Sequence, residues 1–171
     1  MLVDLGIRVS WLARTGWMQS GVPPSMAETV SQHTFLASLI ALDLMRELKR
    51  RGKTFSENKV LKMVLIHDIA EGVVGDLPKW TGDRVNKSDL EEEALSTEIT
   101  QADLLDLWRE YSEGRRMEAK IARLADLMAT WRMSIYYKEL GFPVDDIMRS
   151  TERESLELAE ELGLVIEGGK S

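Results

Sequence analysis

The sequence is organised around one stretch, VLIHDIAEGVVGDLP at residues 64–78, which begins as an apolar run and ends in a glycine-containing loop. Within it His67 and Asp68 are adjacent, Glu71 follows about one helical turn later, and Asp76 stands in the loop. Side chains of these types bind divalent metals and transfer protons. Placing several of them at the end of an apolar helix is unfavourable unless a ligand compensates. The stretch therefore predicts the core of a metal-dependent active site.

Apolar residues recur at helical spacing on both sides of this stretch, and no segment of any length alternates as a β-strand would. Capping boxes at residues 29–32 and 88–91, and a serine at 56, predict helix starts. The sequence therefore predicts an all-α fold without a sheet. The expected helices are a first one ending near Gly16, then residues 29–52, 56–71, an acidic helix from 88, a short apolar one around 104–111, 116–140, and a last one after Pro143.

Composition limits the possible functions. The 171 residues are expected to form one domain, 1–171, with residues 165–171 as a disordered tail. With 22 basic and 29 acidic residues the net charge is −7, so the chain lacks the basic excess that binds nucleic-acid polymers or anionic membranes. Cysteine is absent, and no apolar run approaches the roughly 20 residues that span a bilayer. We expect a soluble, cytoplasmic protein.

Four residues on three predicted helices form a candidate metal-ligand set. The only two histidines, His33 and His67, lie on apolar helix faces, and the set adds the carboxylates of Asp68 and Asp126. Mixed nitrogen and oxygen ligands suit a divalent first-row metal with open positions for water and substrate. Taken singly, each residue has an ordinary structural explanation: a core histidine is usually hydrogen-bonded, and Asp126 can pair with Arg123. Taken together they favour a metal site.

The order of these residues resembles that of the HD-domain phosphohydrolases. The stretches ETVSQH at 28–33, HDIAE at 67–71 and GDLP at 75–78, with LARTGW at 12–17, resemble the 5′-deoxynucleotidase subgroup. The resemblance implies a compact HD-domain bundle of about six or seven helices and one divalent metal such as Co, Mn or Zn. It also implies hydrolysis of 2′-deoxyribonucleoside 5′-monophosphates to deoxynucleoside and phosphate, by a homodimer. An excess of large apolar residues, including Trp108 and Trp131, favours dimer contacts through helical apolar faces.

The resemblance also implies roles for individual residues, which are metal ligation for His33, His67, Asp68 and Asp126, acid–base catalysis for Glu71 and Asp76, and substrate contact for Arg14 and Trp17. Lys79 is a further candidate for phosphate contact, or is simply solvated. Some relatives have the arginine directly before the tryptophan, where this chain has Gly16, and Trp17 can alternatively anchor a surface loop. One carboxylate would take a proton from the attacking water and the other would assist the departing 5′-oxygen; the sequence leaves open which does which.

Two other functions fit the same ligand set. One is a phosphodiesterase or nucleoside triphosphohydrolase, and the other is a non-catalytic helical module with a structural metal. The short chain and the GDLP run favour the monoesterase over the first. Glu71 and Asp76 argue against the second, because a structural metal site does not require them.

Overall fold

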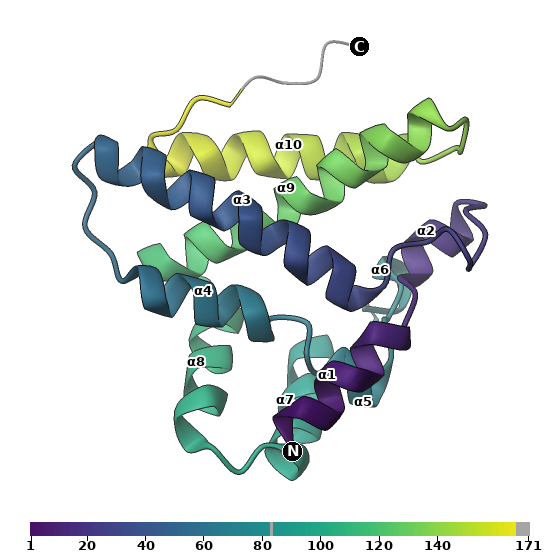
Figure 1. Ribbon diagram of the computed structural model, residues 1–171, viewed down its shortest axis with the longest axis horizontal. Coiled ribbons are helices and arrows are strands. Elements are labelled where there is room, and N and C mark those ends of the chain that lie inside the picture. The colour runs from purple at the N-terminus through teal and green to yellow at the C-terminus, as the bar shows by residue number, and fades with distance from the viewer. Residues whose placement is uncertain (83, 167–171) are drawn as a thin grey trace.

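The computed structural model describes residues 1–82 and 84–166, which are helical and contain no β-strand (Figure 1). The helices are α1 (Leu2–Trp11), α2 (Thr15–Gln19), α3 (Val30–Arg50), α4 (Glu57–Ile66), α5 (Glu71–Val74), α6 (Lys79–Gly82), α7 (Lys87–Glu98), α8 (Ala102–Glu113), α9 (Met117–Glu139) and α10 (Asp145–Leu162). The expected all-α class is confirmed. The short helices α2, α5 and α6 lie in stretches expected to be loops or helix ends. Of the expected tail at 165–171, residues 167–171 lie outside the described residues.

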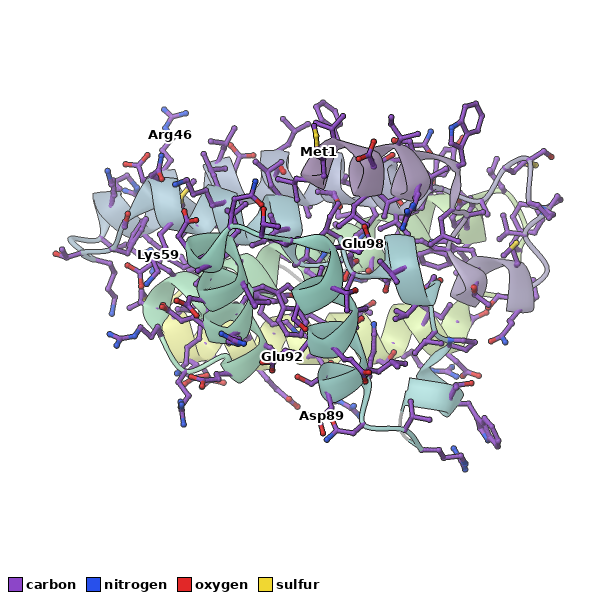
Figure 2. All side chains as sticks on the ribbon, turned by 90° about the horizontal axis from the view of Figure 1, so that it is seen from below. Met1, Arg46, Lys59, Asp89, Glu92 and Glu98 are labelled. Atoms are coloured by element: carbon purple, nitrogen blue, oxygen red, sulfur yellow. The ribbon has the colours of Figure 1, made fainter. Side chains whose placement is uncertain are left out.

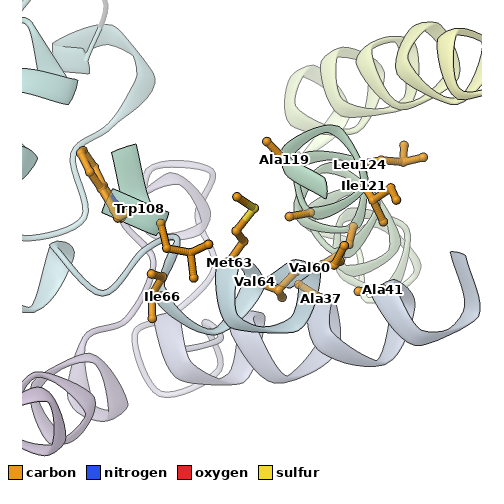
Figure 3. Close-up of a cluster of buried hydrophobic side chains, with 14 of the residues drawn as sticks. Ala37, Ala41, Val60, Met63, Val64, Ile66, Trp108, Ala119, Ile121 and Leu124 are labelled. Atoms are coloured by element: carbon orange, nitrogen blue, oxygen red, sulfur yellow. The ribbon is translucent and has the colours of Figure 1, made fainter. Parts of the chain in front are cut away.

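Helix α9 is the centre of the packing, in contact with α3, α4, α8 and α10. Figure 1 shows α3 crossing α9. Helix α10 runs beside the C-terminal part of α9, and α4 and α8 lie near its N-terminal end. Between α3, α4 and α9 the core combines alanines with branched side chains, which lets the helices approach closely and fill the space between them (Figure 3). The residues drawn there include Ala37, Ala41, Val60, Met63, Val64, Ala119, Ile121 and Leu124.

Three predicted helix starts can be compared with the structure. The capping box at Thr29 is confirmed, since its side chain accepts from the N–H of Gln32 and Gln32 accepts from the N–H of Thr29. Ser56 also caps α4 as expected. The capping box at residues 88–91 is wrong, because Asn86 caps α7 and Ser88 instead contacts Ser112.

The stretch at the centre of the sequence does not form one continuous helix. Helix α4 ends at Ile66, and the backbone N–H groups of residues 69, 71, 72 and 73 donate three residues back rather than four. This tighter winding separates α4 from α5 and corrects the expected helix over 56–71. Gly72 lets α5 lie against α1, since a Cβ there would come within 3.2 Å of the Leu5 carbonyl oxygen. His67 and Asp68 therefore stand at a helix end.

The segment after α1 is extended, which corrects the expected helix end near Gly16. Residues Ala13 and Thr29 form an antiparallel bridge, with the N–H of Arg14 donating to the carbonyl of Glu28 at 3.0 Å. The bridge fixes the residues before α2 against the start of α3. No helix among the described residues is both long and apolar enough to cross a membrane.

Candidate active site

Three helices bring the predicted metal ligands together. His33 lies in the first turn of α3, His67 and Asp68 follow the end of α4, and Asp126 lies in the middle of α9. Ligand atoms of His33, His67 and Asp68 lie within 4.8 Å of one another. Asp126 Oδ1 is 3.0 Å from His33 Nε2 and 3.8 Å from His67 Nε2. These three helices also form the core, so the ligand set stands on a rigid frame.

The geometry of His67 fits a bound cation. Its Nδ1–H donates to the Val64 carbonyl at 2.7 Å, which turns Nε2 toward the carboxylates. That Nε2 is buried, lies 3.1 Å from Asp68 Oδ2, and makes no hydrogen bond to the described residues. Burial lowers the pKa of His67, but Asp68 and Asp126 outweigh burial and raise it to about 9. The field of the carboxylates thus attracts a positive charge, and His33, His67 and Asp68 are positioned to hold a divalent metal.

The two carboxylates beside the imidazoles are held ionised. Burial raises the pKa of Asp68, but the neighbouring His67 outweighs it and the pKa ends well below the usual range. For Asp126, burial is likewise outweighed, chiefly by the hydrogen bond from His33, and its pKa is also lowered. Tyr111 OH donates to Asp126 Oδ2 at 3.2 Å, and Arg123 approaches the same oxygen at 3.4 Å. The pairing of Asp126 with Arg123 expected as its ordinary role therefore coexists with its place among the candidate ligands.

Glu71 opens α5 and is almost fully buried. Its Oε1 accepts a hydrogen bond from Lys87 Nζ at 3.2 Å, whereas Oε2 is buried with no partner among the described residues. Burial, followed by repulsion from Asp68, raises the pKa of Glu71 to about 9. A carboxyl group with one oxygen held and the other free is suited to transferring a proton.

Asp76 is held in place by contacts with Thr15 at the start of α2. Gly75 has φ of 82°, and this left-handed turn ends α5 and leads the chain into Asp76. The carboxylate accepts from the N–H of Thr15, and the Asp76 carbonyl accepts from the Thr15 hydroxyl at 2.9 Å. The start of α2 thereby fixes Asp76 next to Arg14.

Arg14 and Trp17 meet at one buried carboxylate, Glu28. Arg14 Nη1 lies 2.8 Å from His33 Nδ1, 3.1 Å from Thr130 Oγ1 and 3.3 Å from Glu28 Oε1. The Trp17 indole N–H donates to Glu28 Oε1 at 2.9 Å. The Trp17 ring is buried in a small apolar cluster, which is the position that an anchor of the surrounding loop would take.

A cavity of about 480 Å³ connects these groups. Its lining includes Arg14, Trp17, Asp68, Glu71, Asp76 and Asp126, together with Ile147, Ser150, Thr151 and Glu154 of α10. A second cavity of about 410 Å³ lies between α7 and α8, and Asp68, Lys87 and Arg123 line both. Lys79 begins α6, but its side chain lies outside the described part of the structure.

Four residues near the site were not among those predicted from the sequence, namely Glu28, Lys87, Glu91 and Tyr111. Lys87 Nζ lies 3.2 Å from both Glu71 Oε1 and Glu91 Oε1, so α7 supplies the cation beside Glu71. Spacing along the chain gives no sign of this contact, because Lys87 and Glu71 are 16 residues apart. Glu28 does belong to the ETVSQH stretch, and its place in that stretch could have indicated a role at the site.

A family model described as HD domain matches residues 11–160. The chain belongs to the HD-domain family. This HD-domain chain is 31% identical over 128 residues to the 5′-deoxynucleotidase HDDC2 of Dictyostelium discoideum, covering 68% of the chain and 65% of that relative. It is 28% identical over 135 residues to human HDDC2, covering 74% and 62%. The match therefore spans less than two thirds of the length of these curated relatives.

Solved structures agree with this assignment of the HD-domain chain. PH0347 protein from Pyrococcus horikoshii OT3 is 29% identical with a TM-score of 0.84, covering 95% of this chain and 92% of that one. A conserved hypothetical protein from Pyrococcus furiosus is 26% identical with a TM-score of 0.85, covering 94% and 92%. The resemblance to HD-domain 5′-deoxynucleotidases expected from the sequence is confirmed.

Proposed function

We propose that this HD-domain protein is a metal-dependent phosphomonoesterase that hydrolyses 2′-deoxyribonucleoside 5′-monophosphates to deoxynucleoside and phosphate. The observation that carries the proposal is the buried, unpartnered Nε2 of His67 beside Asp68 and Asp126, two carboxylates that line one cavity together with Glu71. The curated relatives named 5′-deoxynucleotidase support the substrate class. The cavity of about 480 Å³ falls within the usual ~300–1,000 Å³ of small-molecule sites.

In this proposal one divalent metal is held by His33, His67, Asp68 and Asp126. When bound, it supplies Lewis acidity, which neutralises charge on the phosphoryl group and makes a water molecule acidic near neutral pH. The proximity of Asp126 Oδ1 to both imidazoles supports Asp126 as the fourth ligand. Co, Mn and Zn all accept such a mixed set, so the chemistry of the ligands alone does not select one.

The protein's own groups move the protons and hold the substrate. Glu71 Oε2 exchanges a proton with the reacting water or the departing 5′-oxygen, while Lys87 holds Oε1 in place. Asp76, fixed by Thr15, takes the complementary role in the same cavity. Arg14 binds the phosphate, the Trp17 ring closes the wall beside the sugar, and Lys79 provides a further phosphate contact.

Phosphate release, together with chromatography of the nucleotide products, tests this function on a panel of nucleotides, because cleavage of a phosphodiester or of a whole triphosphate group releases no free phosphate. Deoxynucleoside 5′-monophosphates, ribonucleoside 5′-monophosphates, deoxynucleoside triphosphates and cyclic dinucleotides are each incubated with Mn²⁺, Co²⁺ or Zn²⁺. We expect phosphate to be released from the deoxynucleoside monophosphates. The release should require added metal and should stop after chelation with EDTA. Preferential cleavage of triphosphates or cyclic dinucleotides would support the alternative HD-type reactions. No cleavage of any substrate, with metal bound, would support a structural metal.

We also propose that the protein is a cytoplasmic homodimer. Trp108 and Trp131 are buried within the fold, so they are not available for the contact. Several exposed apolar residues instead lie along α1 and α3, namely Val3, Ile7, Trp11, Phe35, Leu39 and Leu42. Figure 2 shows Met1, just before α1, and Arg46 of α3 along the same upper side of the view. Exposed apolar patches of this kind mark interaction sites.

Light scattering tests the assembly, and fractionation of cells tests the location. We expect twice the chain mass for the wild type and a monomer for the double variant Trp11→Glu/Leu39→Glu. Leu65→Glu, an exposed apolar residue on α4, is the matched control and should leave the mass unchanged. A wild-type monomer at micromolar concentration would contradict the dimer.

A further inference from the structure

Glu28 is a buried carboxylate that the catalytic proposal leaves without a role. It precedes the capping residue of α3, and its side chain is 3% exposed. Its backbone is fixed at both ends, because the carbonyl accepts from the N–H of Arg14 and the N–H donates to the Tyr137 hydroxyl. A buried charge is costly unless partners compensate, so its contacts should explain why it is there.

One oxygen of Glu28 faces three functional groups. Oε1 accepts from the indole N–H of Trp17 at 2.9 Å, lies 3.3 Å from Arg14 Nη1, and lies 3.8 Å from His33 Nδ1. Oε2 is buried with no hydrogen-bond partner among the described residues. Glu28 therefore joins two proposed substrate contacts to a proposed metal ligand, and it retains unused accepting capacity.

The hydrogen bonds of His33 determine which of its ring nitrogens carries the proton. Arginine only donates, so the 2.8 Å contact from Arg14 makes His33 Nδ1 an acceptor. In the neutral ring the proton is then on Nε2, which donates to Asp126 Oδ1 at 3.0 Å. A protonated Nε2 cannot bind a cation. Metal binding at Nε2 therefore requires the proton on Nδ1, and Nδ1–H then requires an acceptor.

We propose that Glu28 is a positioning residue that accepts Nδ1–H of His33 when a divalent cation occupies Nε2. The imidazole stays neutral, because Nε2 releases its proton to solvent and Nδ1 takes one up. Arg14 loses its acceptor on His33 in the same step and is left with Glu28 and Thr130 at the cavity wall. Glu28 thus couples metal binding to the arginine that meets the phosphate. The inference rests on the metal site of the proposed function.

Glu28→Gln tests the role with little change of shape. The amide keeps one accepting oxygen but loses the negative charge and the second acceptor. Removing a partner of a metal-binding histidine typically costs ~10–100-fold in metal affinity, and we expect a loss of that size for Mn²⁺ by isothermal titration calorimetry. Glu28→Asp retains the charge and should recover part of the affinity. Glu91→Gln is the matched control, since Glu91 is also buried but contacts Lys87 rather than a proposed ligand.

Nitrogen-15 NMR of the imidazole rings gives a readout that a purely structural role would not change. The chain has only two histidines, so the ring signals can be assigned with His67→Gln. Adding Zn²⁺ to the wild type should move the His33 proton from Nε2 to Nδ1. In Glu28→Gln with saturating Zn²⁺, the Nδ1–H signal should be weaker or exchange faster with water. Thermal unfolding of each variant without metal shows whether the fold is kept.

The outcomes separate the two proposals. Glu28→Gln that binds Mn²⁺ as tightly as the wild type, or a His33 ring that keeps Nε2–H with Zn²⁺ bound, overturns the role of Glu28 alone. A wild type that binds no Mn²⁺ or Zn²⁺ overturns this inference together with the metal-dependent function. Normal metal binding without phosphate release contradicts only the proposed activity.

Discussion

The same helices build two regions with opposite chemistry. In α3, Leu48 is fully buried among apolar side chains, whereas His33 near the other end meets Asp126 and Arg14. In α4, Met63 belongs to the apolar core, and His67 one turn later faces carboxylates. The core gains stability from burial, while the polar cluster gathers buried carboxylates whose charge a bound cation would help to balance. Stability and function should therefore respond separately to substitutions in the two regions.

The largest effect is expected from Asp68→Ala. The variant removes the carboxylate nearest His67 Nε2, so it should lose Mn²⁺ binding and phosphate release together. Mn²⁺ should raise the thermal midpoint of the wild type and leave that of the variant unchanged, because only a protein that binds the ion is stabilised by it. A variant that keeps metal-dependent turnover would show that the ligand set is wrong.

A core substitution should give the opposite result. Leu48→Ala leaves a cavity among buried residues of α3, and such changes typically lower the free energy of unfolding by about 2–5 kcal/mol. Because Leu48 lies far along α3 from His33, the affinity for Mn²⁺ at a temperature where the variant is folded should match the wild type. Urea unfolding and calorimetry measure the two quantities. Loss of metal affinity in this variant would mean that the regions are coupled.

A smaller effect concerns pH and the metal-free protein. The pKa of Glu71 is raised from an ordinary 4.5 to about 9, so the folded state holds a proton that the unfolded chain releases above pH 4.5. Stability should therefore fall as pH rises from about 4.5 to 9. Glu71→Gln removes this loss and should be more stable than the wild type at pH 8 by on the order of 1–3 kcal/mol, but nearly equal at pH 4.5. Equal stabilities at both pH values would mean that Glu71 titrates normally.

The features that could be predicted well from the sequence depend on neighbouring residues along the chain. Thr29 and Gln32 cap each other across one turn, and Ser56 caps α4 in the same local way, so both starts follow from spacing. The candidate metal-binding stretch could also be recognised from the sequence, because His67 and Asp68 adjoin an apolar run. The geometry then places His33 and Asp126 beside them, although their roles as ligands stay predictions.

The features that the sequence did not predict depend on contacts through space. Residues 88–91 have the form of a capping box, yet Glu91 is buried against Lys87, whose other partner is Glu71. Glu28 looks like an ordinary residue before a helix until Trp17 and His33 are seen around it. The break after Ile66 is equally hard to predict, since apolar residues return at positions 69 and 70 directly after His67 and Asp68.

The most direct test of the account compares metal content and turnover in Glu71→Ala. The proposed ligands are two histidines and two aspartates, so this variant should keep one equivalent of metal. Loss of the proton-transferring group should lower turnover of a deoxynucleoside monophosphate by on the order of 10²–10⁴-fold. The variant is purified with added Mn²⁺, its metal is measured by mass spectrometry, and phosphate release is followed in parallel. Loss of the metal, or near-full turnover with metal bound, would contradict the role of Glu71 and with it the division between ligands and catalytic groups.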